Sequence, residues 1–359
     1  MLSKNIQAIH RNMKEIFPPL CRIAIAIYDQ ETDTLKTFTH STDGASPISY
    51  YSSKLAHCHA LTQLVKNKEM RIIDNIPEEL ICQEHSNKIK SAGYQSSLTQ
   101  PIFYHDHLIG LLFMNATEIA YFNKRNIKKL DVYIQLISTM LIAETMPIKT
   151  LQGAVLTARA FSRLKDEETG THLARMSHYA RIIALSLGQK HGISDEQVEY
   201  IFQFSPLHDV GKVGIPDAII LKRGILTTQE REVIQTHVDI GRTIIDTMIQ
   251  TFNLSGLMHV QMLRNIVLYH HESYDGQGYP SGLKGNDIPL EARIASVADV
   301  FDALTSIRPY KKAWSNEDAF AFMIKNKNIL FDPDCVDVLV ANKAQLLHIQ
   351  ARFRDEELA

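Results

Sequence analysis

The sequence predicts a multidomain protein in which an α+β domain is followed by an all-α domain. Its 359 residues exceed the usual length of a single core and suggest two domains. Strand-like runs of β-branched residues are concentrated in the first third, whereas helical patterns with short breaks dominate from about residue 150 onward. We therefore place the first domain at residues 1–126, a connecting helix at 127–163 and the second domain at 164–359.

Strand signals predict the fold of the first domain. The segment CRIAIAIYD, which begins at Cys21, is typical of a strand and ends in the turn-like run DQETD. A helical stretch near residues 54–66 comes next, and RIIDN, SSLTQPIFY and LIGLLFMN are predicted as further strands. The last two are separated only by the turn-like HDH, so we expect them to form a hairpin.

The stretch from Gly93 to Phe122 resembles part of a GAF domain. It reads GYQSSLTQPIFYHDHLIGLLFMNATEIAYF, in which a strand, a short turn and a second strand precede a Phe and a closing helix. The resemblance covers about 120 residues and implies that this domain is a sensor that regulates the second domain. The sequence leaves the ligand of such a sensor open.

An apolar stripe is predicted on the connecting helix. Leu130, Ile134, Ile137 and Leu141 recur at spacings of 4, 3 and 4, which places them on one helix face. One interpretation is a helix that pairs with a second copy of the chain, and the alternative is a helix packed on its own domain. Pro147 interrupts the pattern, so we expect a kinked helix that joins the two domains of a homodimer.

Charge and cysteine usage exclude some classes of function. The formal net charge of −2 provides no positive field for duplex nucleic acid, so a phosphate ligand must be held by local Lys and Arg side chains. The four cysteines, Cys21, Cys58, Cys82 and Cys335, form no CxxC pair, which argues against a zinc ribbon or a disulfide framework. This usage favours a reducing cytoplasm.

Hydrophobic runs in the sequence are short. The N-terminal MLSKNIQAIHRNMKEIF has scattered charges and does not resemble a signal peptide. The longest apolar run, LIGLLFM, is far shorter than the ~20 residues that a membrane-spanning helix needs. We expect a cytoplasmic protein without membrane insertion.

The second domain carries more imidazoles and carboxylates than an ordinary core satisfies with hydrogen bonds. The set is Glu168, His172, His208, Asp209, His237, His270, His271 and Asp299. Any one of these has an ordinary explanation as a buried His or a helix-capping Asp. Together they predict a metal cluster, and nitrogen and oxygen ligands without thiolate suit Fe, Mn, Ni or Zn.

Three members of this set, Glu168, His172 and Asp209, carry more specific expectations. Glu168 lies four residues before His172, so on a helix the two lie on one face and can share a metal cluster. Asp209 is the carboxylate that we expect to bridge two metal ions held ~3.5–4 Å apart, a spacing at which a bridging hydroxide becomes a nucleophile.

The same residues carry a specific resemblance. The motifs E-x3-H at 168–172, HDVGK at 208–212, H-x3-G at 237–241, HHExxDGxGYP at 270–280 and ADVFDALTSxRPYK at 298–311 resemble the HD-GYP family of HD-superfamily phosphohydrolases. This implies two or three divalent metal ions, Fe first and Mn, Ni or Zn as alternatives, with the whole set as ligands. It also implies hydrolysis of cyclic di-GMP to linear pGpG and, in some members, onward to GMP.

Further residues are candidates for substrate contacts. We expect Lys212 to stabilise the transition state or assist the leaving oxygen, beside Asp209 as the other catalytic residue. Arg308 and Lys311 are similar to family residues that hold phosphate, although a solvated helix end would also explain them. Tyr279 either faces the ligand or supports the turn that comes after His270 and His271.

These observations support three hypotheses for function. The first is a cyclic di-GMP phosphodiesterase regulated by the GAF-like domain. The second keeps the chemistry and changes the substrate to a related cyclic dinucleotide such as cyclic GMP-AMP. The third is a weakly active interaction module that recruits a diguanylate cyclase.

Overall fold

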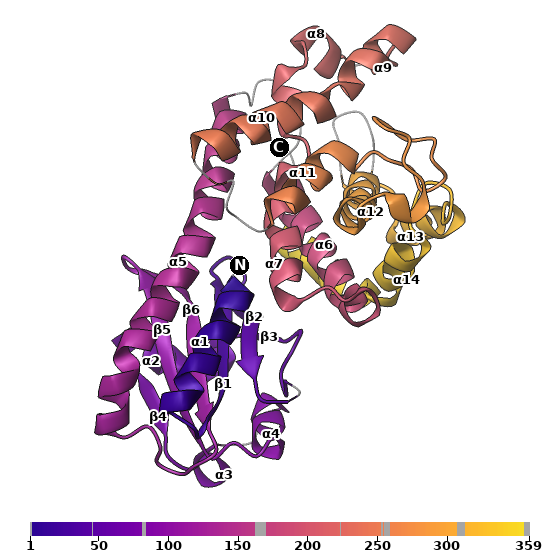
Figure 1. Cartoon of the computed structure of the whole chain (residues 1–359). Helices are drawn as coiled ribbons and strands as arrows, with labels where there is room; N and C mark the ends of the chain where they lie inside the picture. The colour runs from indigo at the N-terminus through magenta and orange to yellow at the C-terminus, as the bar shows by residue number, and fades with distance from the viewer. Residues whose placement is uncertain are drawn as a thin grey trace. The chain divides into compact units, whose positions relative to one another are not determined.

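The computed structural model of the chain describes residues 2–44, 46–80, 84–161, 170–222, 224–252, 254, 259–306 and 313–354 (Figure 1). The chain forms two compact units. The first comprises Met1–Met146 with Ser194–Glu196, and the second comprises Pro147–Ile193 with Gln197–Ala359.

A six-stranded antiparallel sheet, in the order β3-β2-β1-β6-β5-β4, forms the centre of the N-terminal unit. The strands are β1 (Leu20–Asp29), β2 (Thr34–Thr42), β3 (Ser52–Lys54), β4 (Arg71–Ile73), β5 (Ser96–Tyr104) and β6 (His107–Ala116). The apolar residues of β1 and β6 are mostly buried because these two strands pair at the middle of the sheet. The predicted hairpin is present, since β5 pairs with β6 from Ser96 to Tyr104.

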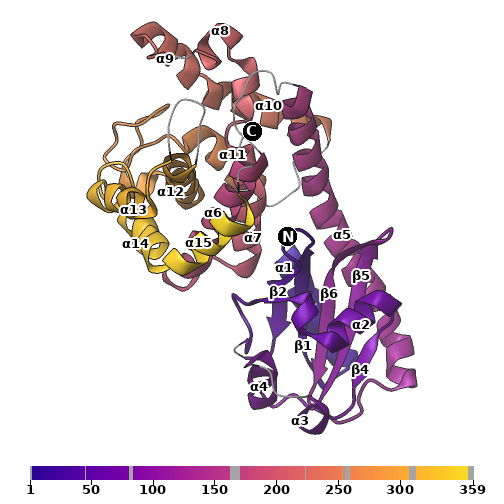
Figure 2. The ribbon, with the colours of Figure 1, turned by 180° about the vertical axis from the view of Figure 1, so that it is seen from behind.

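Helices cover both faces of this sheet. They include α1 (Leu2–Ile16), α2 (His59–Asn67), α3 (Ile76–Glu79), α4 (Glu84–Ser91) and the short 3-10 helix η1 (Leu55–His57). The opposite views in Figures 1 and 2 place α1 over one face and α2 over the other. The predicted α+β class is confirmed. The strand β2 and the helix α1 were not predicted, although Leu35 and Phe38 are buried on β2.

The helix α5 (Lys124–Phe161) contains the predicted apolar stripe. Leu130, Ile134, Ile137 and Leu141 are each at most 3% exposed within the single chain, and all four belong to the N-terminal unit. Their neighbour Tyr133 makes an edge contact with Phe17, with ring centroids 6.1 Å apart. The stripe therefore packs on its own domain and gives no support for a homodimer, which stays a prediction.

The C-terminal unit is helical, which confirms the predicted all-α class. Its α-helices are α6 (Gly170–His191), α7 (Asp195–Phe204), α8 (Asp217–Ile220), α9 (Thr228–Gln235), α10 (His237–Thr251), α11 (Val260–Tyr269), α12 (Leu290–Thr305), α13 (Asn316–Lys325), α14 (Pro333–Ala341) and α15 (Lys343–Arg352). Short 3-10 helices lie at η2 (Ser205–Leu207), η3 (Val210–Gly214) and η4 (Gly285–Asp287). Among the described residues of this unit, only an isolated bridge between Lys327 and Phe331 has strand pairing.

The helix α12 lies at the centre of this bundle, where it packs against α6, α11, α13 and α14. Ala292, Ala295 and Ala298 are fully buried on it, and their small side chains allow close approach of the neighbouring helices. None of the described helices is both long enough and apolar enough to cross a membrane.

Candidate metal centre

Segments far apart in the chain bring the predicted ligands together. His172 comes from α6, His208 and Asp209 lie between η2 and η3, and Asp299 comes from α12. His237 is the first residue of α10, and His270 directly follows the last residue of α11, with His271 next. Three of the imidazoles thus lie at helix ends, where a side chain can turn toward a shared space.

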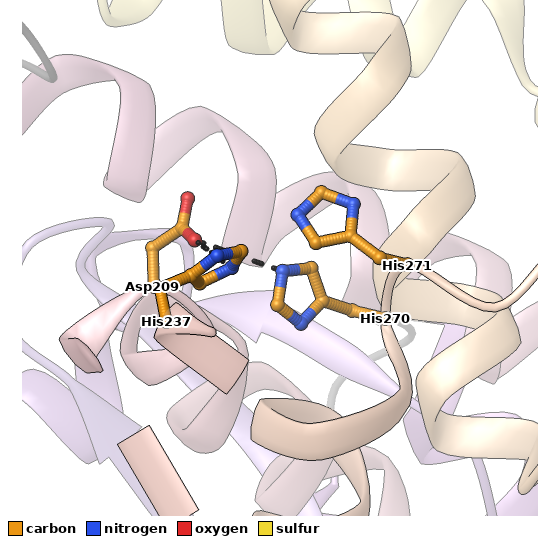
Figure 3. Close-up of side chains that lie close together, drawn as sticks. All are labelled: Asp209, His237, His270 and His271. Atoms are coloured by element: carbon orange, nitrogen blue, oxygen red, sulfur yellow. Dashed lines mark ion pairs between the residues drawn. The ribbon is translucent and has the colours of Figure 1, made fainter. Parts of the chain in front are cut away.

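One cluster consists of Asp209, His237, His270 and His271, drawn in Figure 3. Each offers one possible ligand atom, and these atoms lie within 4.8 Å of one another. The Oδ1 atom of Asp209 is 3.0 Å from Nε2 of His237 and 3.7 Å from Nε2 of His270. Three imidazoles therefore lie around one carboxylate group.

A second cluster consists of His172, His208 and Asp299, and its possible ligand atoms meet the same 4.8 Å limit. The Oδ1 atom of Asp299 is 3.6 Å from Nε2 of His172 and 3.8 Å from Nε2 of His208. Both histidines are buried, and the Asp299 side chain is 16% exposed. This cluster therefore reaches solvent through its carboxylate.

Asp209 lies between the two clusters. Its Oδ1 faces His237 and His270, whereas its Oδ2 is 3.0 Å from Nε2 of His208 in the second cluster. Lys212, one turn farther along, places its Nζ 2.7 Å from the same Oδ2. One carboxylate oxygen thus faces each cluster, which is the arrangement that a bridging ligand requires.

The imidazoles are held from behind through Nδ1. Nδ1 of His208 is 2.9 Å from the Ser205 carbonyl oxygen, that of His237 is 2.7 Å from the Ile234 carbonyl oxygen, and that of His270 is 3.0 Å from the Ile266 carbonyl oxygen. A carbonyl oxygen only accepts, so each Nδ1 carries the proton and donates. Each Nε2 then presents its lone pair to the cluster, as metal-binding histidines do.

The donor set fits a metal ion. Nε2 of His237, Nε2 of His270 and Oδ1 of Asp209 are buried and make no hydrogen bond to the described residues. Lone pairs on three acceptor atoms that face one another repel unless a cation lies among them. Nitrogen and oxygen donors without sulfur suit Fe, Mn, Ni or Zn. The geometry thus supports binding of divalent metal.

Electrostatics favour the protonation states that metal ligands need. Burial alone would raise the pKa of Asp209, but Lys212 and His208 more than offset this and hold its pKa well below the ordinary value. Burial lowers the pKa of His270, and burial together with His270 lowers the pKa of His271. The carboxylate is therefore charged and both imidazoles are neutral near pH 7.

A buried ion network holds His172, and it was not predicted from the sequence. The carboxylate of Asp302 lies 2.8 Å from Nδ1 of His172 and accepts from Nε of Arg175 at 2.7 Å and from Oγ of Ser306 at 2.9 Å. Burial alone would raise the pKa of Asp302, but the hydrogen bonds from His172 and Arg175 lower it overall. Asp302 lies three residues after Asp299 on α12, so helical spacing was the available signal.

Two glycines permit close backbone approaches at the site. A Cβ atom on Gly211 of η3 would lie 1.8 Å from the His237 carbonyl oxygen, so glycine lets η3, with Asp209 and Lys212 around it, pack on α10. A Cβ atom on Gly278 would lie 2.1 Å from the Ser273 backbone nitrogen. Both positions require the absence of a side chain.

The loop after His271 is tied to the site. Glu272 is buried and accepts hydrogen bonds from the backbone N–H groups of Ser281 at 2.7 Å and Leu283 at 3.0 Å. The ring of Tyr279 stacks on that of His271, with centroids 4.8 Å apart and planes at 24°. Tyr279 therefore contacts a predicted ligand directly and supports its orientation.

The structure describes most of the site residues that the sequence predicts. These are His172, His208, Asp209, Lys212, His237, His270, His271, Tyr279 and Asp299. The other predicted residues, Glu168, Arg308 and Lys311, lie outside the described residues. Every predicted metal ligand except Glu168 therefore falls into one of the two clusters that Asp209 joins.

Comparison with known proteins agrees with this geometry. Residues 164–335 match the family model described as an HD domain. The cyclic di-GMP phosphodiesterase response regulator RpfG of Xanthomonas campestris is 46% identical over 189 residues, which are 53% of this chain and 47% of that protein. A cyclic di-GMP phosphodiesterase of Thermotoga maritima is 37% identical over 196 residues, 55% of this chain and 50% of its own length.

A relative with a different named substrate also matches. The 3'3'-cGAMP-specific phosphodiesterase 2 of Vibrio cholerae is 37% identical over 191 residues, which are 53% of this chain and 34% of that protein. The chain spans about half or less of the length of each of these relatives. Residues 164–335 of this chain therefore match an HD domain, and the motifs of the chain resemble those of the HD-GYP family.

Proposed function

We propose that the chain is a metal-dependent phosphodiesterase that hydrolyses cyclic di-GMP. The observation that carries the proposal is the position of Asp209, whose two carboxylate oxygens face two separate groups of buried imidazoles. Relatives named as cyclic di-GMP phosphodiesterases match about half of the chain. The product is linear pGpG, with further hydrolysis to GMP.

The two clusters would hold the metal ions, with His237, His270 and His271 on one side of Asp209 and His172, His208 and Asp299 on the other. Divalent ions bound there would supply Lewis acidity toward a phosphodiester and lower the pKa of water. Iron is the first candidate, with Mn, Ni and Zn as alternatives. The backbone carbonyl groups behind His208, His237 and His270 keep each Nε2 aimed at the ions.

Lys212 places a positively charged side chain of the protein beside the proposed metal centre. Its ammonium group lies 2.7 Å from Asp209, and its side chain is 21% exposed, so it borders both the buried carboxylate and solvent. From that position it would stabilise negative charge that develops on a phosphate oxygen or protonate the leaving oxygen. Arg308 and Lys311 are proposed to hold the non-reacting phosphate oxygens.

Several finer expectations belong to the same proposal. Glu168, four residues before His172, would extend the site to a third ion and favour the second hydrolytic step. The first domain predicted from the sequence, at residues 1–126, would act as a GAF-like sensor, with residues 127–163 as the connection to the catalytic domain at 164–359. A cytoplasmic location and a diguanylate cyclase partner stay predictions.

Turnover by the purified full chain tests the proposal. Protein prepared without oxygen is incubated with cyclic di-GMP and either Fe(II) or Mn(II), and the products are separated by chromatography. We expect pGpG with at least one metal, and none from the Asp209→Ala variant. Absence of any linear product with both metals would contradict the proposal.

One observation favours 3'3'-cGAMP as an alternative substrate. A relative named as specific for 3'3'-cGAMP matches a similar share of the chain. Parallel assays with cyclic di-GMP and 3'3'-cGAMP at equal concentration decide between them. A larger kcat/KM for 3'3'-cGAMP would show that this dinucleotide is the preferred substrate, and the proposed phosphodiesterase reaction would stay the same.

A further inference from the structure

A pocket of about 470 Å³ lies within the N-terminal unit and shares no residue with the two metal-ligand clusters. The sheet forms one wall. Arg22 pairs across β1 and β6 with Asn115, which pairs with Ser97 on β5. The next row of the sheet adds Ala24 and Phe113. These five residues line the pocket, so charge, polar groups and apolar surface meet on one face of the sheet.

The opposite wall is formed mainly by apolar residues of the helices. Leu61 of α2, Ile76 of α3, Leu80 next to α3 and Ile89 of α4 line it. Figure 2 shows α2 in front of the sheet, on the face opposite to α1. A volume of this size, with apolar walls and a few polar groups, is typical of sites for small organic molecules.

Arg22 is the unusual group in this pocket. The residue is 5% exposed, and its Nη1 donates to Oδ1 of Asn115 at 3.1 Å. Its Nε is buried and makes no hydrogen bond to the described residues. No carboxylate of the described residues forms an ion pair with it, and burial lowers the pKa of its guanidinium. A buried cation without an anion is costly.

The remaining charges of the lining do not neutralise Arg22. Lys54 and Arg71 add positive charge. Glu79 is the single carboxylate among the described lining residues, and its Oε1 accepts from the backbone N–H groups of Asp74 at 3.0 Å and Asn75 at 2.7 Å. The pocket therefore has an excess of positive charge beside a large apolar surface.

We propose that this pocket binds a small organic carboxylate with an apolar body. The carboxylate would accept hydrogen bonds from the Nε and Nη2 edge of Arg22, because Nη1 already donates to Asn115. A planar carboxylate matches such an edge with two parallel hydrogen bonds. The apolar body would lie between Phe113 and Leu61. A polyphosphate is disfavoured, since one buried guanidinium faces mostly apolar walls.

Binding of matched acids and amides tests this inference. The full chain is titrated calorimetrically with cinnamate, indole-3-acetate and 4-methyl-2-oxopentanoate, and with the neutral amide of each. We expect at least one acid to bind at one site per chain, about tenfold or more tighter than its amide. Equal affinity for acid and amide, or no binding by any of the three acids, would overturn the inference.

Variants test whether Arg22 causes the tighter binding of an acid than of its amide. Arg22→Gln should weaken acid binding about tenfold or more and leave the amide unchanged. Lys66→Gln removes one exposed positive charge from α2, outside the pocket, and should change neither affinity. If Arg22→Gln does not fold, Arg22→Met fills similar space without charge and should give the same loss. Acid preference that survives in the folded variant would contradict the role of Arg22.

These titrations need neither bound metal nor turnover. Their failure would leave the proposed phosphodiesterase function untouched, and failure of the hydrolysis assay would leave this pocket unaffected.

Discussion

Four buried histidines are fixed through Nδ1, and His172 differs from the other three because its Nδ1 contacts a carboxylate instead of a carbonyl group. The carboxylate of Asp302 is fully buried and also accepts from Arg175. It therefore has two functions: it orients an imidazole of the metal centre and neutralises a buried guanidinium.

The first prediction concerns this network. Asp302→Asn turns one acceptor oxygen into a donor and leaves Arg175 without its anion, so the free energy of unfolding should fall by about 3–5 kcal/mol. Ser306→Ala is the control that keeps the Arg175–Asp302 ion pair. It removes the hydrogen bond from Ser306 to Asp302 and the one from Arg175 to Ser306, and it should cost about 1–2 kcal/mol. Chemical denaturation measures the free energy of unfolding of both variants. Equal losses would show that the ion pair between Arg175 and Asp302 stabilises the protein no more than the hydrogen bonds of Ser306 do.

Only part of the site could be predicted from the sequence. His and Asp at helical spacings are recognisable because metal binding selects those residue types. Arg175 was missed because its partner Asp302 is 127 residues away, and no local pattern joins them. The role of Tyr279 could not be decided, since its stacking on His271 depends on how the loop folds back.

At the scale of elements, the contact between η3 and α10 positions the carboxylate that joins the two clusters. It depends on Gly211, which approaches the backbone at His237 and Gly241 too closely for a side chain. Gly214 of the same 3-10 helix faces only the side chain of Ile240, and a Cβ atom on it would lie 2.8 Å from Cγ2 of that side chain.

The second prediction compares these two glycines. Gly211→Ala must push η3 away from α10, so it should cost about 1–3 kcal/mol or more and remove most bound metal. Gly214→Ala should be milder, because a side chain can rotate where a backbone cannot. Thermal unfolding and metal content measure both effects. A Gly211→Ala protein with normal metal content would show that the close contact does not position Asp209.

The helix α5 shows why periodicity alone left two interpretations open. A stripe at spacings of 4, 3 and 4 identifies an apolar helix face but does not say what covers that face. In the structure its own unit covers it, whereas Leu136 is 45% exposed on another face of the helix. The strand β2 was missed because its sequence, TLKTFTHST, carries few apolar residues, of which Leu35 and Phe38 are buried.

The third prediction concerns the burial of Ile137 on α5. Ile137→Lys places a charge in the core of the N-terminal unit and should lower its stability by about 3 kcal/mol or more. Leu136→Lys, one residue earlier on the exposed face, should leave the thermal midpoint nearly unchanged. Light scattering of the same samples checks the alternative of helix pairing: a folded Ile137→Lys monomer from a dimeric parent would favour the homodimer interpretation.

At the scale of the whole molecule, the two fold classes were predictable because strand and helix patterns separate along the chain. The ligand class proposed for the N-terminal unit could not be predicted from the sequence. The pocket beside Arg22 is built by pairing of β1, β5 and β6, and β1 lies far from the other two strands in sequence. The metal centre likewise joins residues from His172 to Asp299. Its motifs are visible in the sequence, whereas the position of Asp209 between the two clusters is a property of the fold.

Metal analysis of the full chain, purified without oxygen, tests whether Asp209 joins two metal sites. We expect two or three divalent ions per chain in the unmodified protein, and a loss of most of them in Asp209→Ala, because that change removes the carboxylate between the clusters. An unmodified protein that holds no more than one ion per chain, or an Asp209→Ala variant with full metal content, would contradict it.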